Sequence, residues 1–136
     1  MSWKIKDDLK QKIADEWGVE VYQPGLRHPV AFVYPNVYHL GMSNLGMHIL
    51  YQMINARGDS ACERFFLPES NLIKEHQKTK TALLSVETQR QLSDFSVIFV
   101  MLSFNNITLA DSCRCASLSL LNLLISSSIP NKSVIV

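Results

Sequence analysis

The sequence predicts an α/β protein with a flavodoxin-like or Rossmann-like doubly wound parallel sheet. Two runs, 29–34 and 97–102, are almost uninterrupted in their apolar character, which is typical of strands buried on both faces of a parallel sheet. A segment with helical spacing of apolar residues follows each run. Strands that alternate with helices imply right-handed crossovers, a parallel sheet and helices on both of its faces.

The amino-terminal part predicts a helix that is separate from this sheet. Ile5, Leu9, Ile13 and Trp17 recur every four residues between charged positions, which indicates a short amphipathic helix ended by Gly18. Residues 19–28 contain a Pro-Gly pair and several polar residues, so we interpret them as a connector. We therefore divide the chain into an amino-terminal helix with its connector, 1–28, and an α/β domain, 29–136.

Within the domain the first strand is followed by a predicted loop, 35–42. Ser43 is a candidate cap for a helix that ends near Arg57-Gly58. Next come a second strand, a short helix opened by proline, and a small strand or hairpin arm, at 61–67, 68–77 and 82–86 respectively.

The carboxyl-terminal part predicts one more helix and one more strand. Thr108 and Asp111 form a helix start signal, and an apolar face continues up to three serines at 126–128. Pro130 breaks the helix, and 133–136 begin another buried strand. We expect the sheet to lack its last strand, and an unpaired edge there predicts self-association, against which a clean monomer at high concentration would count.

Composition excludes several functional classes. The net charge of +1 gives no field that would attract nucleic acid or an acidic membrane. The longest apolar stretch, 116–125, is far shorter than the roughly 20 residues of a membrane span. The amino terminus has no secretory signal, so we expect a cytoplasmic protein.

No G-x-S-x-G, P-loop or G-x-G-x-x-G motif is present, so we expect no catalytic residue. Cys62, Cys113 and Cys115 lack metal-ligand spacing, so we expect no metal site.

Doubly wound sheets bind ligands beyond the carboxyl ends of their strands, where the strand order reverses. In this chain that crevice is predicted to be lined by residues 35–46 and 103–108. Each candidate also has a structural interpretation. The glycines can serve turns and packing, His39 can be a surface residue, Tyr38 can cover the end of the sheet, and Asn105 can be a turn residue. The candidate cofactor-binding residues are Asn36, Tyr38, His39, Gly41, Ser43, Gly46, Ser103 and Asn105.

Several blocks together resemble one family. They are Tyr34-Pro35-Asn36-Val37-Tyr38-His39-Leu40-Gly41-Met42-Ser43-Asn44-Leu45-Gly46, Ile49-Leu50-Tyr51, Cys62-Glu63-Arg64-Phe65-Phe66-Leu67-Pro68, Leu84-Ser85-Val86-Glu87 and Leu92-Ser93-Asp94-Phe95. In this order, from about 29 to 104, they resemble the amino-terminal region of B12-binding-domain radical S-adenosylmethionine (SAM) proteins. The resemblance weakens after Phe104.

The resemblance implies an accessory domain that positions a cofactor or substrate for a radical SAM catalytic barrel, its partner in the parent protein. The 4Fe-4S cluster and SAM would belong to that barrel, because the C-x-x-x-C-x-x-C motif is absent from this chain. Without it, this chain is not expected to cleave SAM alone.

Cobalamin is the candidate cofactor that the resemblance implies, but the cobalt-ligating motif D-x-H-x-x-G is changed. Asn36 stands at the Asp position and Tyr38 at the His position, while His39 is one residue out of register. Two alternatives stay open: a non-catalytic binding or interaction module that has lost its cofactor, and a flavodoxin-like module that binds FMN at the same loops. Glu63 is expected on an edge strand with solvated charges, and the sequence places no acid–base pair among Glu63, Arg64, Glu87 and Asp94.

Overall fold

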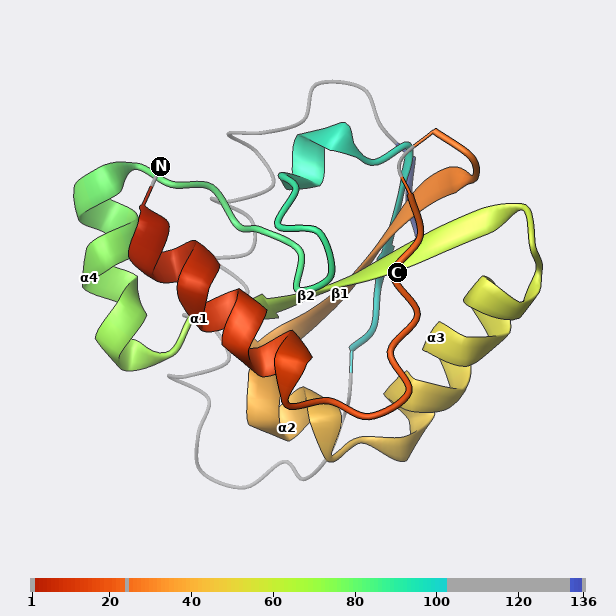
Figure 1. The fold of residues 1–136 in the computed structure, drawn as a ribbon, viewed down its shortest axis with the longest axis horizontal. Helices are drawn as coiled ribbons and strands as arrows, with labels where there is room; N and C mark the ends of the chain where they lie inside the picture. Colours follow the sequence, from red (N-terminus) through yellow and green to blue (C-terminus); the bar gives the residue numbers. More distant parts are fainter. Residues whose placement is uncertain (1, 24, 103–132, 136) are drawn as a thin grey trace.

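The computed structural model describes residues 2–23, 25–102 and 133–135, and the structural statements below concern these residues (Figure 1). Four strands form one parallel sheet in the order β2-β1-β3-β4. This order matches the first four strands of the flavodoxin-like arrangement and confirms the predicted fold class. The strands are β1 (His28–Val37), β2 (Ser60–Leu67), β3 (Val97–Val100) and β4 (Ser133–Ile135).

The order of the strands reverses between β1 and β3. The chain leaves β1 toward β2 on one side, and then returns to place β3 on the other side of β1. The carboxyl ends of β1 and β3 are therefore the switch point at which ligands bind in this class of sheet. Their parallel register runs from Val30 beside Val97 to Val33 beside Val100, so the two ends lie together.

The helices are α1 (Trp3–Ala14), α2 (Tyr38–Met42), α3 (Leu45–Ala56) and α4 (Ser70–Thr79), with a short 3-10 helix η1 (Leu92–Asp94). α3 connects β1 to β2 along the chain and packs on the sheet. α1 and α4 lie beside each other beyond the carboxyl end of β2 (Figure 1). α2 follows β1 directly and lies at the same end of the sheet.

Several predicted boundaries were wrong. β1 continues to Val37, and residues 38–42 form α2 where a loop was predicted. α1 ends at Ala14, well before Gly18, and the side chain of Trp17 is fully exposed instead of lying on an apolar helix face. The predicted small strand at 82–86 is reduced to one antiparallel bridge between Leu84 and Gln91. The predicted helix after Thr108 lies outside the described residues.

Each face of the sheet carries its own apolar cluster because neighbouring residues of a strand point to opposite faces. On one face Val33, Phe65 and Ile98 pack with Phe95 from the segment before β3. On the other face Phe32, Tyr34, Cys62 and Phe66 pack with Met47 of α3. Leu9 and Ile13 of α1 pack against this second cluster, so the amino-terminal helix docks on the domain.

α3 is apolar on two sides. Met47 is fully buried against the sheet, yet Leu45, Ile49 and Met53 are 73%, 48% and 62% exposed. These three residues are four apart, so they form one outward ridge of the helix. No charged residue occurs in the 12 residues of α3. The helix therefore presents an uncharged apolar ridge to its surroundings.

Among the described helices, none combines the length and apolar character that crossing a membrane requires.

Candidate functional site at the carboxyl edge of the sheet

The turn between α2 and α3 is built around Asn44. Its Oδ1 accepts a hydrogen bond from the backbone N–H of Met47 at 3.1 Å, which caps the amino terminus of α3. Its Nδ2 donates to Tyr34 Oη at 3.4 Å, which ties the cap to the end of β1. Ser43, the predicted cap, instead donates from Oγ to the carbonyl of Leu40 at 2.9 Å. The sequence signal was correct to within one residue, because Asn and Ser are both good caps.

Two glycines of this segment have different surroundings. A Cβ at Gly41 would lie 2.2 Å from Cε1 of Phe66, so the glycine is needed for the contact between α2 and β2. A Cβ at Gly46 would lie 3.2 Å from Oδ1 of Asn44 and 3.4 Å from the methyl group of Met101, just after β3. Gly46 thus lies where the ends of β1 and β3 meet. Gly41 is a packing residue on the side of α2 that faces Phe66 of β2.

The remaining predicted site residues are distributed around this edge. Asn36 is exposed, and its Oδ1 accepts from the next backbone N–H. His39 is exposed on α2. Tyr38 is half-buried, packs edge-on against Phe66 with ring centroids 5.3 Å apart, and donates from Oη to Glu16 at 2.5 Å. Ser103 and Asn105 lie outside the described residues. Tyr38 therefore points toward the amino-terminal segment and covers the end of the sheet.

A buried ion cluster adjoins Tyr38. The guanidinium of Arg64 on β2 donates from Nε to Glu87 at 2.6 Å and from Nη2 to Glu16 at 2.8 Å. Both the Arg64 and the Glu87 side chains are almost completely buried, at 2% and 1% exposure. The guanidinium also lies 4.7 Å from the ring centre of Tyr51 on α3. Three distant segments of the chain therefore meet at one arginine.

The same cluster closes the outer edge of β2. Edge strands carry unpaired backbone groups that invite further strands to pair. Here Glu87 Oε2 accepts from the backbone N–H of Arg64 at 2.7 Å, and the backbone N–H of Val86 donates to the Arg64 carbonyl at 2.9 Å. Farther along, Asn55 Oδ1 accepts from the N–H of Cys62 at 2.8 Å. Side chains and one loop thus take the place of a neighbouring strand.

Glu63 and Arg64 correct the sequence-based prediction. β2 is an edge strand as predicted, but its charges are not solvated, because both residues are buried. Glu63 accepts from Thr88 Oγ1 at 2.6 Å on the opposite face of the sheet. Sequence reasoning missed these pairs because the partners are more than 20 residues away. The available signal was that Glu63-Arg64 and Val86-Glu87 both lie in blocks that the resemblance had already marked.

Burial changes the pKa values of several groups in the cluster. Burial raises the pKa of Glu87 above its ordinary value, although Arg64 opposes the shift. Burial alone would lower the pKa of Arg64, but the attraction of Glu87 and Glu16 raises it overall. Burial, with the neighbouring carboxylates, raises the pKa values of Tyr38 and Tyr51. Both phenols and the guanidinium are therefore protonated at neutral pH.

Cys62 is a buried thiol beside this cluster, and burial raises its pKa above the ordinary value. Only the thiolate reacts rapidly with alkylating reagents. We expect Cys62 to stay unmodified by iodoacetamide at pH 8 in the folded protein and to react after denaturation. Peptide mapping by mass spectrometry measures this residue separately from the other two cysteines. Rapid labelling of Cys62 without denaturant would contradict the described packing.

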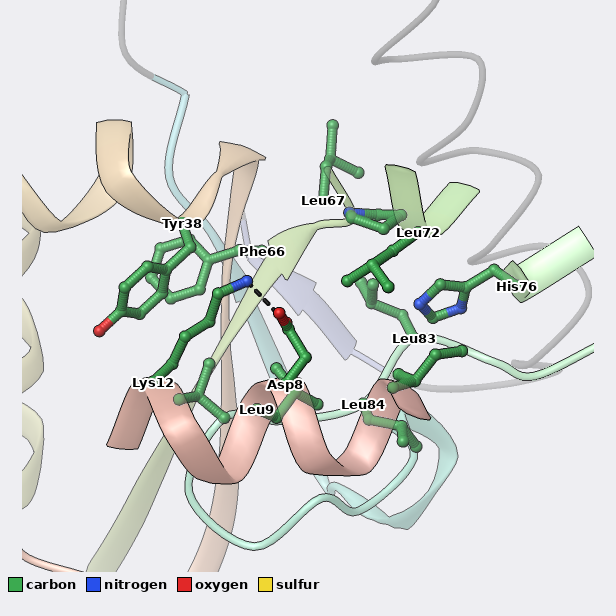
Figure 2. A pocket seen from close by; sticks show the side chains of 13 residues that line it. Asp8, Leu9, Lys12, Tyr38, Phe66, Leu67, Leu72, His76, Leu83 and Leu84 are labelled. Carbon is green, nitrogen blue, oxygen red and sulfur yellow. Dashed lines mark hydrogen bonds and ion pairs between the residues drawn. The ribbon is translucent and has the colours of Figure 1, made fainter. Parts of the chain in front are cut away.

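A cavity of about 30 Å³ lies between α1, α4 and the carboxyl end of β2 (Figure 2). Its wall is largely apolar, with the ring of Tyr38 beside Phe66 on one side and His76 of α4 on the other. The Lys12–Asp8 ion pair, at 2.8 Å, crosses it. This volume holds about two water molecules, so it is too small for an organic cofactor.

The described residues do not fit cobalt ligation by a protein side chain at the position of the family motif. Tyr38 occupies the position of the ligating histidine, and its hydroxyl is already bonded to Glu16. No group of three His, Cys, Asp or Glu side chains within the described ranges is arranged to hold a metal ion. A cobalamin at this edge would have to bind without a ligand from Tyr38.

Comparison with known proteins identifies the family. The family described as "Radical SAM proteins, N-terminal" matches residues 46–132, which is more than half of the chain. Neither the curated proteins nor the solved structures yielded a match. The matched range contains nearly all of α3 and the whole of β2, α4 and β3, together with the Arg64–Glu87 pair. The chain therefore belongs to the family of amino-terminal regions of radical SAM proteins.

Proposed function

We propose that this chain is an accessory domain that holds a cofactor or substrate at the carboxyl edge of its sheet, next to the catalytic domain of a radical SAM protein. The match to the amino-terminal family carries this proposal. The arrangement of the strands supports it, because β1 and β3 end together at a switch point beside Gly46. The 4Fe-4S cluster and SAM would belong to the catalytic domain, and the parent protein would be cytoplasmic.

Cobalamin is the first cofactor to test. His39 is exposed at this edge, and Gly46 lies in the first turn of α3 beside Met101, just after β3. FMN is the alternative ligand for the same loops, since flavodoxin-like sheets bind it at their switch point. A yellow chromophore that copurifies with the chain would favour FMN.

The ridge of α3 favours a second candidate, an interaction module without a cofactor. Leu45, Ile49 and Met53 form an exposed apolar ridge on a helix without charges, which is typical of a helix that packs on both sides. In the parent protein this ridge would contact the catalytic domain. Self-association through the outer edge of β4 remains a further prediction for the isolated chain.

Titration of the purified chain with hydroxocobalamin, followed by calorimetry and visible spectroscopy, tests the cofactor proposal. We expect saturable binding that is weakened at least about tenfold by Gly46→Val, because the larger side chain would collide with Asn44 and Met101 and distort the turn between α2 and α3; a tenfold change corresponds to about 1.4 kcal/mol. His39→Ala is expected to weaken binding as well. His28→Ala is the matched control, because His28 is an exposed histidine at the opposite end of β1.

Absence of binding at high micromolar cobalamin would overturn the cofactor proposal and leave the interaction module. Equal effects of His39→Ala and His28→Ala would place any binding away from the carboxyl edge.

A further inference from the structure

The carboxylate of Glu16 accepts hydrogen bonds from Arg64 and Tyr38 in the way that the carboxylate of a bound ligand would. One of its oxygens accepts from Nη2 of Arg64 at 2.8 Å, and the other accepts from Oη of Tyr38 at 2.5 Å. Its side chain is only 9% exposed. An arginine and a tyrosine that donate to the two oxygens of one carboxylate are a common way to recognise organic acids. The contact has the chemistry of a binding site.

The two donors are fixed independently of Glu16. Glu87 accepts from Nε of Arg64 at 2.6 Å, Met42 Sδ lies 3.2 Å from Nη1, and the ring of Tyr51 lies along the guanidinium. The Tyr38 ring packs against Phe66. These contacts orient both donors before a carboxylate binds, which lowers the entropic cost of binding.

Glu16 itself comes from a weakly held segment. It lies two residues beyond the end of α1, just before the connector that leads to β1. Its neighbours Asp15, Trp17 and Gly18 are exposed, and Trp17 is 101% exposed. Segments with few buried contacts open locally at low free-energy cost. The carboxylate of Glu16 can therefore leave Arg64 and Tyr38, and an external carboxylate can replace it, without unfolding of the sheet.

We propose that Arg64 and Tyr38 form a carboxylate-binding site, which Glu16 occupies as an internal ligand. A small organic carboxylate, or the carboxylate of a larger ligand, would bind when the connector moves away. Lys12 lies with Nζ 5.3 Å from the centre of the Tyr38 ring, and its charge is paired with Asp8 at 2.8 Å and with Glu69 at 3.4 Å. The site lies at the end of β2 and does not depend on cobalamin binding.

The test is chemical rescue of Glu16→Ala by propionate, which supplies the removed CH2–COO⁻ group with one additional methyl group. We expect the variant to have a lower Tm than the wild type, and propionate to raise that Tm saturably. At ten times its dissociation constant the rise should be about 5 °C for a domain of this size. Asp15→Ala is the matched control, because this neighbouring carboxylate is exposed and bonds only within the helix end.

The controls separate a carboxylate site from general effects. Propanamide and sodium chloride of equal ionic strength should not raise the Tm of Glu16→Ala, and Glu16→Gln should not respond to propionate because its side chain still fills the site. Tyr38→Phe in the Glu16→Ala background should weaken propionate binding by roughly tenfold, the loss of about one charge-assisted hydrogen bond. Phosphate serves as a second anion and should bind less well than propionate.

Two results would overturn the proposal. The first is that propionate leaves the Tm of Glu16→Ala unchanged, or that propanamide and chloride raise this Tm by the same amount as propionate does. The second applies if Glu16→Ala does not fold alone: we then expect propionate to restore folding, and a variant that stays unfolded in propionate would contradict the site. Because no cobalamin is present, this outcome is independent of the cofactor titration.

Discussion

Replacing Arg64 by methionine is expected to lower the free energy of unfolding by about 3–5 kcal/mol, the usual cost of breaking a buried ion pair. The substitution keeps most of the aliphatic part of the side chain but leaves the Glu87 carboxylate without its Nε donor at 2.6 Å. It also removes the contact with Glu16 that holds the connector. Urea denaturation followed by circular dichroism measures the loss.

Two variants make this prediction specific. Arg57→Met removes an exposed pair with Asp59, whose side chains are 66% and 54% exposed, and should change stability by less than about 1 kcal/mol. The double variant Arg64→Met/Glu87→Gln removes both charges of the Arg64–Glu87 pair but keeps an acceptor for the backbone N–H of residue 64. We expect it to recover more than half of the loss. An Arg64→Met variant as stable as the wild type would show that the cluster is not formed as described.

Gly41→Ala is expected to destabilise the protein by about 1–3 kcal/mol, because the site is overpacked. The added Cβ would lie 2.2 Å from Cε1 and 2.8 Å from Cδ1 of Phe66, which is closer than van der Waals contact allows. This loss is expected although alanine favours helices more than glycine does. Gly46→Ala is the matched control: its nearest neighbours would be at 3.2 Å, and the effect should be small. Thermal denaturation measures both.

A second substitution tests the cause of the Gly41 effect. Phe66→Leu in the Gly41→Ala background removes ring atoms from the point of contact, so the combined loss should be smaller than the sum of the two single losses. Strict additivity would contradict a direct clash between these residues. A stable Gly41→Ala variant with weaker ligand binding would instead restore the ligand role that the sequence suggested.

The sequence predicted the sheet well for a physical reason. A strand buried on both faces needs a continuous apolar run, and β1 and β3 each contain one. The helix α2 was missed because it has only five residues and follows a strand that contains Pro35 and Asn36. The end of α1 was misplaced because Trp17 continued the periodicity of four, although the helix ends at Ala14 and leaves the indole in solvent.

The carboxyl edge was predicted from topology, but the buried ion cluster was not. Charged residues in an edge strand are usually solvated, so Arg64 gave no local sign of burial. Its partners come from the connector and from a loop, 48 and 23 residues away in sequence. Such contacts depend on the docking of α1 and on the turn after Val86, which no periodicity in the sequence encodes.

The central claim is that a ligand binds at the carboxyl edge of this sheet. Its most direct test is a titration of the ¹⁵N-labelled chain with hydroxocobalamin, followed residue by residue in ¹H–¹⁵N correlation spectra. We predict saturable shifts of the amides between His39 and Gly46, with those of His28 and Asp59 at the opposite edge unchanged. Spectra that do not change, or shifts confined to the opposite edge, would contradict the claim.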